Sequence, residues 1–192
     1  MKSVLISTRP KLVEKICHKI GEDETGKAIY EKRIEVRKTA PQEVPFKCYI
    51  YETKGQYVKF THGAHTKYGY GRGKVIGEFI CDKVYSIKNR GSSFSVADEE
   101  QSVTNEIARQ SCLYYDDMVS YFGNKDGFGW HISDLKIYDK PKELSEFRKP
   151  CDRFLDCCTC RRLVHNEYMS CDNKITRPPL SWCYVEDLGE EE

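Results

Sequence analysis

The spacing of apolar residues along the chain changes several times, and each spacing predicts a different element. Residues 4–8 begin with a short apolar run that predicts a strand. Residues 11–20 place their apolar side chains at helical spacing, which predicts a helix with one apolar face, and Pro10 fits its first turn. Residues 21–30 are polar and contain two glycines, so we expect a surface loop. Residues 32–38, "KRIEVRK", alternate with a period of two and predict a strand.

The rest of the chain continues with strands and two helices. Aromatic and β-branched residues predict strands, and a period near 3.6 predicts helices. The expected strands are 46–53, about 74–87 after a glycine-rich loop, and 127–138, which ends in a proline turn; the expected helices are 102–113 and 114–122. Strands dominate and no βα unit repeats, so we predict an α+β domain with a mostly β core.

Charge is distributed unevenly although the whole chain has a net charge of only +1. Residues 1–92 contain 19 Lys and Arg against 10 Asp and Glu, a balance of +9. Such a basic block favours an anionic partner, although cations also simply cover solvated surfaces. The opening lacks the pattern of a signal peptide and no apolar run is long enough to span a membrane, so we expect a cytosolic protein.

The basic strand is the first candidate site. Alternate residues of a strand share a face, so Arg33, Glu35 and Arg37 should lie on one side and Lys32 on the other. Lys32 and Glu35, three residues apart, should then meet only through a bulge or bend. Guanidinium groups bind phosphate with two parallel hydrogen bonds, which favours nucleic-acid contact. The alternative is a ladder of surface salt bridges.

The glycine-rich segment 61–74 is the second candidate. Tyr68 and Tyr70 could stack on unpaired bases while neighbouring histidines and cations meet phosphates. A flexible hairpin tip explains the same composition. The start of the first helix, the basic strand and the glycine-rich segment together supply the expected nucleic-acid-binding residues. These are Arg9, Lys11, Arg33, Arg37, Lys38, Tyr68, Tyr70, Arg72 and Lys74. The stretch "GWHISD" adds an acid–base alternative at His131 and Asp134, although a strand core explains it more simply.

Cysteines crowd one end of the chain, with five between residues 151 and 171. Cys157 and Cys160 form a C-x2-C pair, a spacing that lets two thiolates hold one tetrahedral ion. We expect a structural zinc ion bound by Cys151, Cys157, Cys160 and Cys171, with Cys158, His165 and Cys183 as substitute ligands. Redox-active or free thiols remain the alternative. The other cysteines, at positions 17, 48, 81 and 112, fall on apolar faces, where burial is expected.

Several stretches resemble the ASCH family, a branch of the PUA-like β-barrels. They are "LISTRPKLVEKI" followed by "YEKRIEVRK", the central "GKVIGEFICDKVYSI", the closing "YFGNKDGFGWHISDLKIYDKPKELSEF" and the tail "ITRPPLSWCYVEDL". These motifs occur in the same order as in the family and together cover nearly the whole chain. The resemblance points to the small, phage-associated members. It implies a mostly antiparallel PUA-like barrel flanked by helices, with a cleft beside the first helix.

The resemblance also implies a function. Family members are thought to bind or act on RNA, some as nucleases and some as amidohydrolases of modified nucleosides that use a lysine and a threonine. Lys32 matches that lysine, but Glu35 stands at the threonine, so no hydroxyl nucleophile is present there.

We therefore expect an RNA-directed nucleic-acid-binding domain at 1–148, a zinc-stapled cysteine-rich tail at 149–187 and an acidic end at 188–192. The alternatives are an enzyme in the same cleft, with Lys32 and Glu35 as its polar pair, and a phage or host protein-interaction module.

Overall fold

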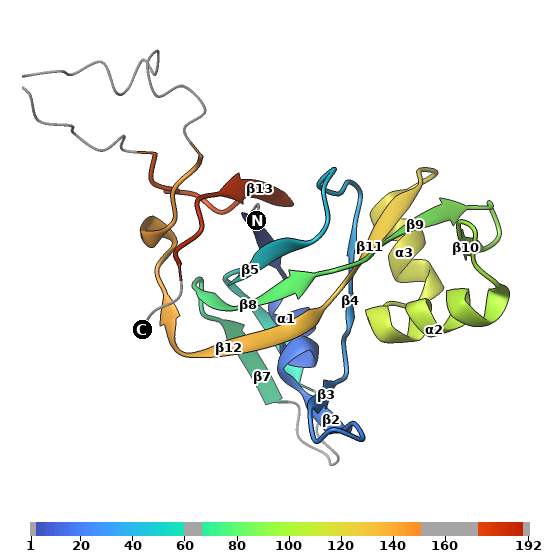
Figure 1. Cartoon of the computed structure of the whole chain (residues 1–192), viewed down its shortest axis with the longest axis horizontal. Coiled ribbons are helices and arrows are strands. Elements are labelled where there is room, and N and C mark those ends of the chain that lie inside the picture. The colour runs from blue at the N-terminus through green and yellow to red at the C-terminus, as the bar shows by residue number, and fades with distance from the viewer. Residues whose placement is uncertain (1–2, 60–66, 151–172, 190–192) are drawn as a thin grey trace, which may run out of the picture.

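The computed structural model of the chain describes residues 3–59, 67–150 and 173–189. Strands predominate, in two larger sheets and two hairpins (Figure 1). The first sheet has the order β12 (Ser133–Lys142), β8 (Val75–Cys81), β5 (Phe46–Glu52), β1 (Ser3–Thr8) and β13 (Trp182–Val185). The second has the order β10 (Phe94–Val96), β9 (Val84–Asn89), β11 (Gly127–His131) and β4 (Ile34–Arg37). All neighbours are antiparallel except β1 and β5.

The hairpins and helices pack around these sheets. One hairpin is β2 (Lys19–Glu22) with β3 (Ala28–Tyr30), and the other is β6 (Gly55–Lys59) with β7 (Lys67–Gly71). The helices are α1 (Pro10–Cys17), α2 (Gln101–Ser111) and α3 (Tyr115–Phe122), with a short 3-10 turn at Leu144–Glu146. The predicted α+β class is confirmed. The described strands, however, stay in separate sheets and do not close into one barrel.

Two long stretches pass from one sheet to the other. The chain leaves β8 for β9 and leaves β11 for β12, as the continuous ribbons in Figure 1 show. Our predictions of one strand over about 74–87 and one over 127–138 are therefore wrong. β8 and β12 belong to the first sheet, whereas β9 and β11 belong to the second. The partner changes at Ile132, between His131, which pairs with Ile34, and Ser133, which pairs with Ile80. Just inside β12, Asp134 has a positive φ of 46° next to a register shift, which bends the strand.

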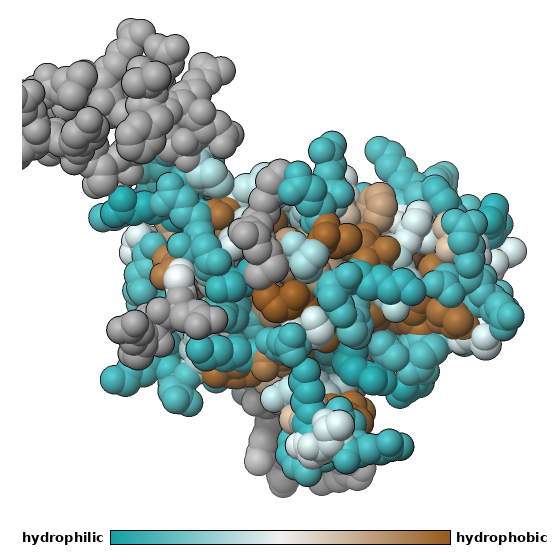
Figure 2. Space-filling model, in the orientation of Figure 1, coloured by the Kyte–Doolittle hydropathy of each residue, from teal (hydrophilic) through white to brown (hydrophobic). Residues whose placement is uncertain are grey.

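The hydrophobic core has three parts, of which the third surrounds Tyr49 and Phe147. The first lies under the first sheet, where Val13 and Ile16 of α1 pack beside Trp130. The second lies between the second sheet and helices α2 and α3, around Ile107 and Phe122. Hydrophilic side chains cover most of the face shown in Figure 2 around a hydrophobic centre, as expected for a chain with 32% charged residues. In the described part of the chain, every helix is too short or too polar to cross a membrane.

Two segments predicted as loops contain strands. The polar residues 21–30 turn at Gly26, with a φ of 82°, and form part of the β2–β3 hairpin. The glycine-rich residues 67–71 form β7 and pair with β6. Both segments form strands because their backbones pair with a neighbouring strand. Neither segment has the alternating apolar pattern from which strands are predicted.

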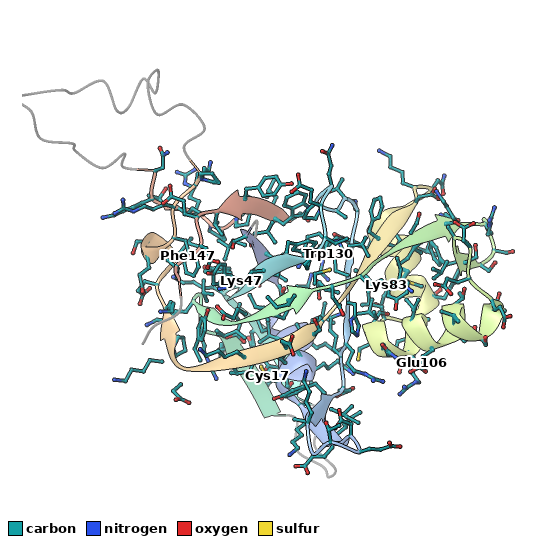
Figure 3. All side chains as sticks on the ribbon, in the orientation of Figure 1. Cys17, Lys47, Lys83, Glu106, Trp130 and Phe147 are labelled. Atoms are coloured by element: carbon teal, nitrogen blue, oxygen red, sulfur yellow. The ribbon has the colours of Figure 1, made fainter. Side chains whose placement is uncertain are left out.

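The C-terminal residues join the first sheet. Trp182–Val185 pairs with β1, and Phe147 packs edge-on against Tyr49 with ring centroids 4.9 Å apart (Figure 3). A bridge between Arg148 and Lys174 brings together the two points where the chain leaves and re-enters the described region.

Candidate functional site

Three charged side chains of the basic segment are buried together. Lys32, Glu35 and Arg37 expose 0%, 3% and 5% of their surface. Lys32 Nζ lies 3.4 Å from Glu35 Oε2, and Arg37 Nη2 lies 2.8 Å from Glu35 Oε1. Buried charges are costly unless they are paired and hydrogen-bonded, so the three side chains depend on one another.

Lys32 precedes the strand instead of belonging to it. Its Nζ donates to the carbonyls of Ile34 at 2.5 Å and Ser111 at 2.8 Å, the second at the C-terminal end of α2. Burial lowers the pKa of Lys32, while Glu35 acts in the opposite direction. We expected Lys32 and Glu35 to meet only through a bulge or bend in the strand. They do meet, because β4 begins only at Ile34 and strand alternation does not apply to Lys32.

Arg37 connects β4 to the first sheet. Its Nη2 donates to the Ser7 carbonyl at 3.0 Å and to Thr8 Oγ1 at 3.1 Å, and its Nη1 donates to the Ser181 carbonyl at 3.2 Å. Arg37 thus holds backbone together in the interior and does not lie on an open basic face. Its ion pair with Glu35 is buried, so Arg37 is not part of the surface ladder of salt bridges that we considered for this segment.

Arg33 and Lys38 lie toward the helices. Arg33 Nη2 is 3.5 Å from Glu106 Oε1, on α2 (Figure 3). Hydrogen bonds to Glu106, first of all from Arg109, lower the pKa of this carboxyl to about 2. Lys38 Nζ lies 5.2 Å from the centroid of the Tyr121 ring on α3. These two cations are therefore separated from the candidates on the glycine-rich segment.

Tyr68 and Tyr70 share one face of the β6–β7 hairpin. They lie opposite Val58 and Gln56 and are 57% and 70% exposed. The opposite face of β7 is closed by Tyr57, since a Cβ atom at Gly69 would lie 2.4 Å from the Tyr57 ring. Glycine at this position therefore lets one aromatic ring pack beneath the strand while the others face outward.

The end of β7 packs on the start of α1. A Cβ atom at Gly71 would lie 2.5 Å from the Pro10 ring, so the strand passes closely by Pro10. The neighbouring cations Arg9, Lys11 and Arg72 are exposed. Lys74 is partly buried, and its Nζ lies 2.7 Å from Glu143 Oε1 in an ion pair. Three of the predicted cations and both predicted tyrosines thus come from the elements that meet here.

A cavity of about 590 Å³ lies between α1 and this hairpin. Its walls include Lys11 and Arg72 together with the apolar Val13 and Ile76. They also include Glu52, a buried acid that we did not predict as a site residue. A charged residue at the end of the apolar strand "FKCYIYE" is the sequence feature that indicates it.

His131 and Asp134 do not form a pair. His131 Nδ1 lies 2.6 Å from Asp82 Oδ1, whereas Asp134 Oδ1 accepts a hydrogen bond from Lys27 Nζ at 2.6 Å. Trp130 is fully buried between the sheets, with its ring centroid 5.1 Å from that of Phe46 (Figure 3). Trp130 is therefore a core residue, as the simpler interpretation of this segment predicts.

Most predicted metal ligands lie outside the described residues, which is where Cys151, Cys157, Cys158, Cys160, His165 and Cys171 fall. The remaining one, Cys183, is on β13 opposite Leu5. Within the described ranges, no three His, Cys, Asp or Glu side chains gather as a metal site. Of the four cysteines expected to be buried, Cys48 and Cys81 are buried, Cys112 is partly buried and Cys17 is exposed.

Comparison with known proteins identifies the fold. No protein-family model matches the chain, and no curated protein matches it. Among solved structures, ASCH from Zymomonas mobilis superposes with a TM-score of 0.51 at 15% identity, covering 96% of this chain and 88% of that one. A tyrosine-to-phenylalanine mutant of the same protein gives 0.52 at 15% identity, covering 97% and 91%. A serine-to-alanine mutant gives 0.51 at 15% identity, covering 96% and 89%. The chain therefore has an ASCH-like fold, as the sequence motifs predicted.

Proposed function

We propose that the protein binds single-stranded RNA on the outer face of the β6–β7 hairpin. The observation that carries this proposal is the pair Tyr68 and Tyr70, exposed by 57% and 70% on one face of β7. Aromatic rings placed in this way offer successive stacking positions to unpaired bases. Val58, 41% exposed, extends the same face and supports contact with an apolar ring surface.

Cations beside the hairpin support the proposal. Arg9 and Lys11 at the start of α1 and Arg72 after β7 are exposed near the point where Gly71 passes Pro10. Backbone phosphates are the natural partners of such a group, because each neutralised phosphate releases counterions. The choice of RNA over DNA rests on the ASCH-like fold, since members of that family are thought to bind or act on RNA.

The proposal is tested by fluorescence anisotropy with a short, labelled, single-stranded RNA of mixed sequence at low salt. One stacked base contributes about 1–3 kcal/mol, so Tyr68→Ala with Tyr70→Ala should weaken binding at least about tenfold. Tyr114→Ala is the matched control, because Tyr114 is 83% exposed but lies before α3. Equal affinities for the wild type and the double variant would contradict the proposal. A wild type that binds neither RNA nor DNA would favour the protein-interaction module.

We also propose a structural zinc ion in the cysteine-rich segment. Cys151 and Cys171 each lie two residues beyond Lys149 and Asn173 in sequence, and the Lys149 amide donates to the Asn173 carbonyl at 2.9 Å. The chain thus leaves and re-enters the domain at one place, which supports a single ion held by cysteines from both ends of the segment.

Hydrolysis is a second candidate function, favoured by the 3.4 Å contact between Lys32 Nζ and Glu35 Oε2. A buried lysine with a lowered pKa can act as a base. Both side chains are buried, however, so a substrate reaches them only if their surroundings move. Turnover of RNA or of an acylated nucleoside by the wild type, lost in Lys32→Ala, would establish this function in place of simple binding.

A further inference from the structure

The cavity beside α1 contains a carboxylate whose hydrogen-bonding capacity is only partly used. The side chain of Glu52, at the end of β5, is 8% exposed. Its Oε2 accepts a hydrogen bond from the Arg72 amide at 3.0 Å and lies 3.8 Å from Arg72 Nε. Its Oε1 has no partner within the described residues. A buried carboxylate needs donors around it, so this wall favours a ligand that presents N–H groups.

Part of the remaining lining is apolar. Val13 and Ile76, 5% and 1% exposed, form part of the apolar surface, and Tyr57 and Ile137 line the cavity with them. The volume of about 590 Å³ lies within the range of roughly 300–1,000 Å³ that is typical of small-ligand sites. Such a lining favours a ligand with apolar faces and a polar edge.

A second acid in the cavity is already neutralised. Glu31 Oε1 lies 2.6 Å from Lys15 Nζ, and Glu31 Oε2 lies 3.0 Å from His18 Nδ1. These bonds, first of all the one from Lys15, lower the pKa of Glu31. Glu52, by contrast, meets only the backbone amide and a distant guanidinium of a single residue, which leaves it available to a ligand.

We propose that this cavity binds a guanine base and that Glu52 accepts hydrogen bonds from the guanine N1–H and N2–H groups. Guanine alone among the four standard bases has two adjacent nitrogen donors on its Watson–Crick edge. Two parallel donors match the two oxygens of a carboxylate, in the geometry that also joins arginine to carboxylate. Arg72, whose side chain is 61% exposed, lies beside the carboxylate and provides a cation for the nucleotide phosphate.

This inference rests on the proposed function and makes it more specific. Tyr57 belongs to β6 and faces the side of the hairpin opposite to Tyr68 and Tyr70. A strand of RNA stacked on the outer face can therefore place a following base around the hairpin into the cavity. Single strands that contain guanine are then the preferred ligands.

The first test uses the wild type with single nucleotides, by isothermal titration calorimetry. Guanosine 5′-monophosphate should bind at least about tenfold more tightly than the adenosine, cytidine and uridine monophosphates, since hydrogen bonds to a charged acceptor are strong. Inosine 5′-monophosphate, which lacks the N2 donor, should bind with intermediate affinity, and 1-methylguanosine 5′-monophosphate should bind poorly. Equal binding of the four standard nucleotides, or no binding of any, would overturn the proposal.

The second test compares Glu52→Gln with Glu14→Gln. Both variants remove one negative charge from the same cavity wall, but Glu14 is exposed on α1. Glu52→Gln should abolish the preference for guanosine monophosphate, whereas Glu14→Gln should retain it. Equal effects of the two variants would reduce the role of Glu52 to net charge and overturn the proposal. If Glu52→Gln does not fold, as judged by circular dichroism, the wild-type nucleotide series decides.

Different results would contradict the RNA-binding proposal and the guanine-site proposal. RNA oligomers that bind with no preference for guanine would remove the guanine site and leave RNA binding intact. Guanosine monophosphate that binds in a Glu52-dependent manner, while RNA oligomers do not bind, would retain the site and remove RNA binding.

Discussion

Lys32 and Glu35 form an ion pair in the interior, with Nζ and Oε2 3.4 Å apart and side chains 0% and 4% exposed. The pair does not stand alone, because the same ammonium group bonds two backbone carbonyls and the same carboxylate bonds Arg37. One of those carbonyls belongs to Ser111 at the end of α2, so the pair also connects that helix to the start of β4. Its integrity therefore matters to the fold in addition to any chemistry.

Replacing Lys32 with methionine should lower the free energy of unfolding by about 3–5 kcal/mol. The buried Glu35 carboxylate would keep only Arg37 as a charged partner, and two buried carbonyls would lose their donor. Chemical denaturation measures the change. Lys27→Met is the control: its ion pair with Asp134 has side chains 59% and 66% exposed, and exposed pairs of this kind contribute little to stability. Similar losses for the two variants would show that the Lys32 pair has no special role in stability.

The sequence predicts the order of most elements because their apolar residues repeat with the right period. The first helix and the central strand β5 are of this kind, and both are found. Prediction fails where tertiary pairing decides. Lys32 continues the alternating pattern of "KRIEVRK" but lies before the strand begins, so its contact with Glu35 could not be derived from alternation.

The candidate site, too, could be predicted from the sequence only in part. Tyr68 and Tyr70 were predicted as stacking residues from the composition of the glycine-rich segment, and the structure leaves both exposed on one face. Arg37 has the same charge as Arg72 in the sequence, yet one is buried and the other exposed. Glu52 escaped prediction because its role depends on a cavity built from α1, the β6–β7 hairpin and β8, which are separate in sequence.

Salt should weaken RNA binding steeply if phosphate contacts contribute. For single strands, the logarithm of the binding constant falls with the logarithm of salt concentration by about 0.7 for each neutralised phosphate. Arg72→Ala should therefore reduce the slope by about 0.7. Lys125→Ala, an exposed cation after α3, should leave it unchanged. Binding that is insensitive to salt would exclude a role for these cations, and the measurement is a series of anisotropy titrations.

The freshly reduced protein should contain about one zinc ion per chain, as expected for a four-cysteine site. Mass spectrometry of the metal content checks this, and Cys157→Ser should lower it while Cys17→Ser, at an exposed cysteine of α1, should not. A chelator should reduce thermal stability, since structural zinc contributes folding free energy. A metal content well below one, or one unchanged in Cys157→Ser, would contradict the ligand assignment.

Asp187 should make the attachment of the C-terminal residues sensitive to acid. Its Oδ1 accepts hydrogen bonds from Tyr49 Oη at 2.6 Å and Lys47 Nζ at 3.0 Å (Figure 3 labels Lys47). Burial alone would raise the pKa of Asp187, but these bonds lower it below its ordinary value of 3.8. A carboxyl group whose pKa is lower in the folded than in the unfolded chain stabilises the protein above the unfolded pKa. That contribution is lost as the pH falls through the folded pKa.

At neutral pH, Asp187→Asn should therefore melt at a lower temperature than the wild type. The difference should shrink as the pH falls below 3.8, because the wild type then loses the same charge. Asp139→Asn, which removes an exposed carboxylate on β12, is the control and should show no such difference. Thermal melts followed by tryptophan fluorescence are suitable, since Trp182 on β13 lies 5.8 Å from Trp130 between ring centroids. A difference in melting temperature that stays constant from neutral to acid pH would show that the Asp187 carboxylate does not hold this segment through its charge.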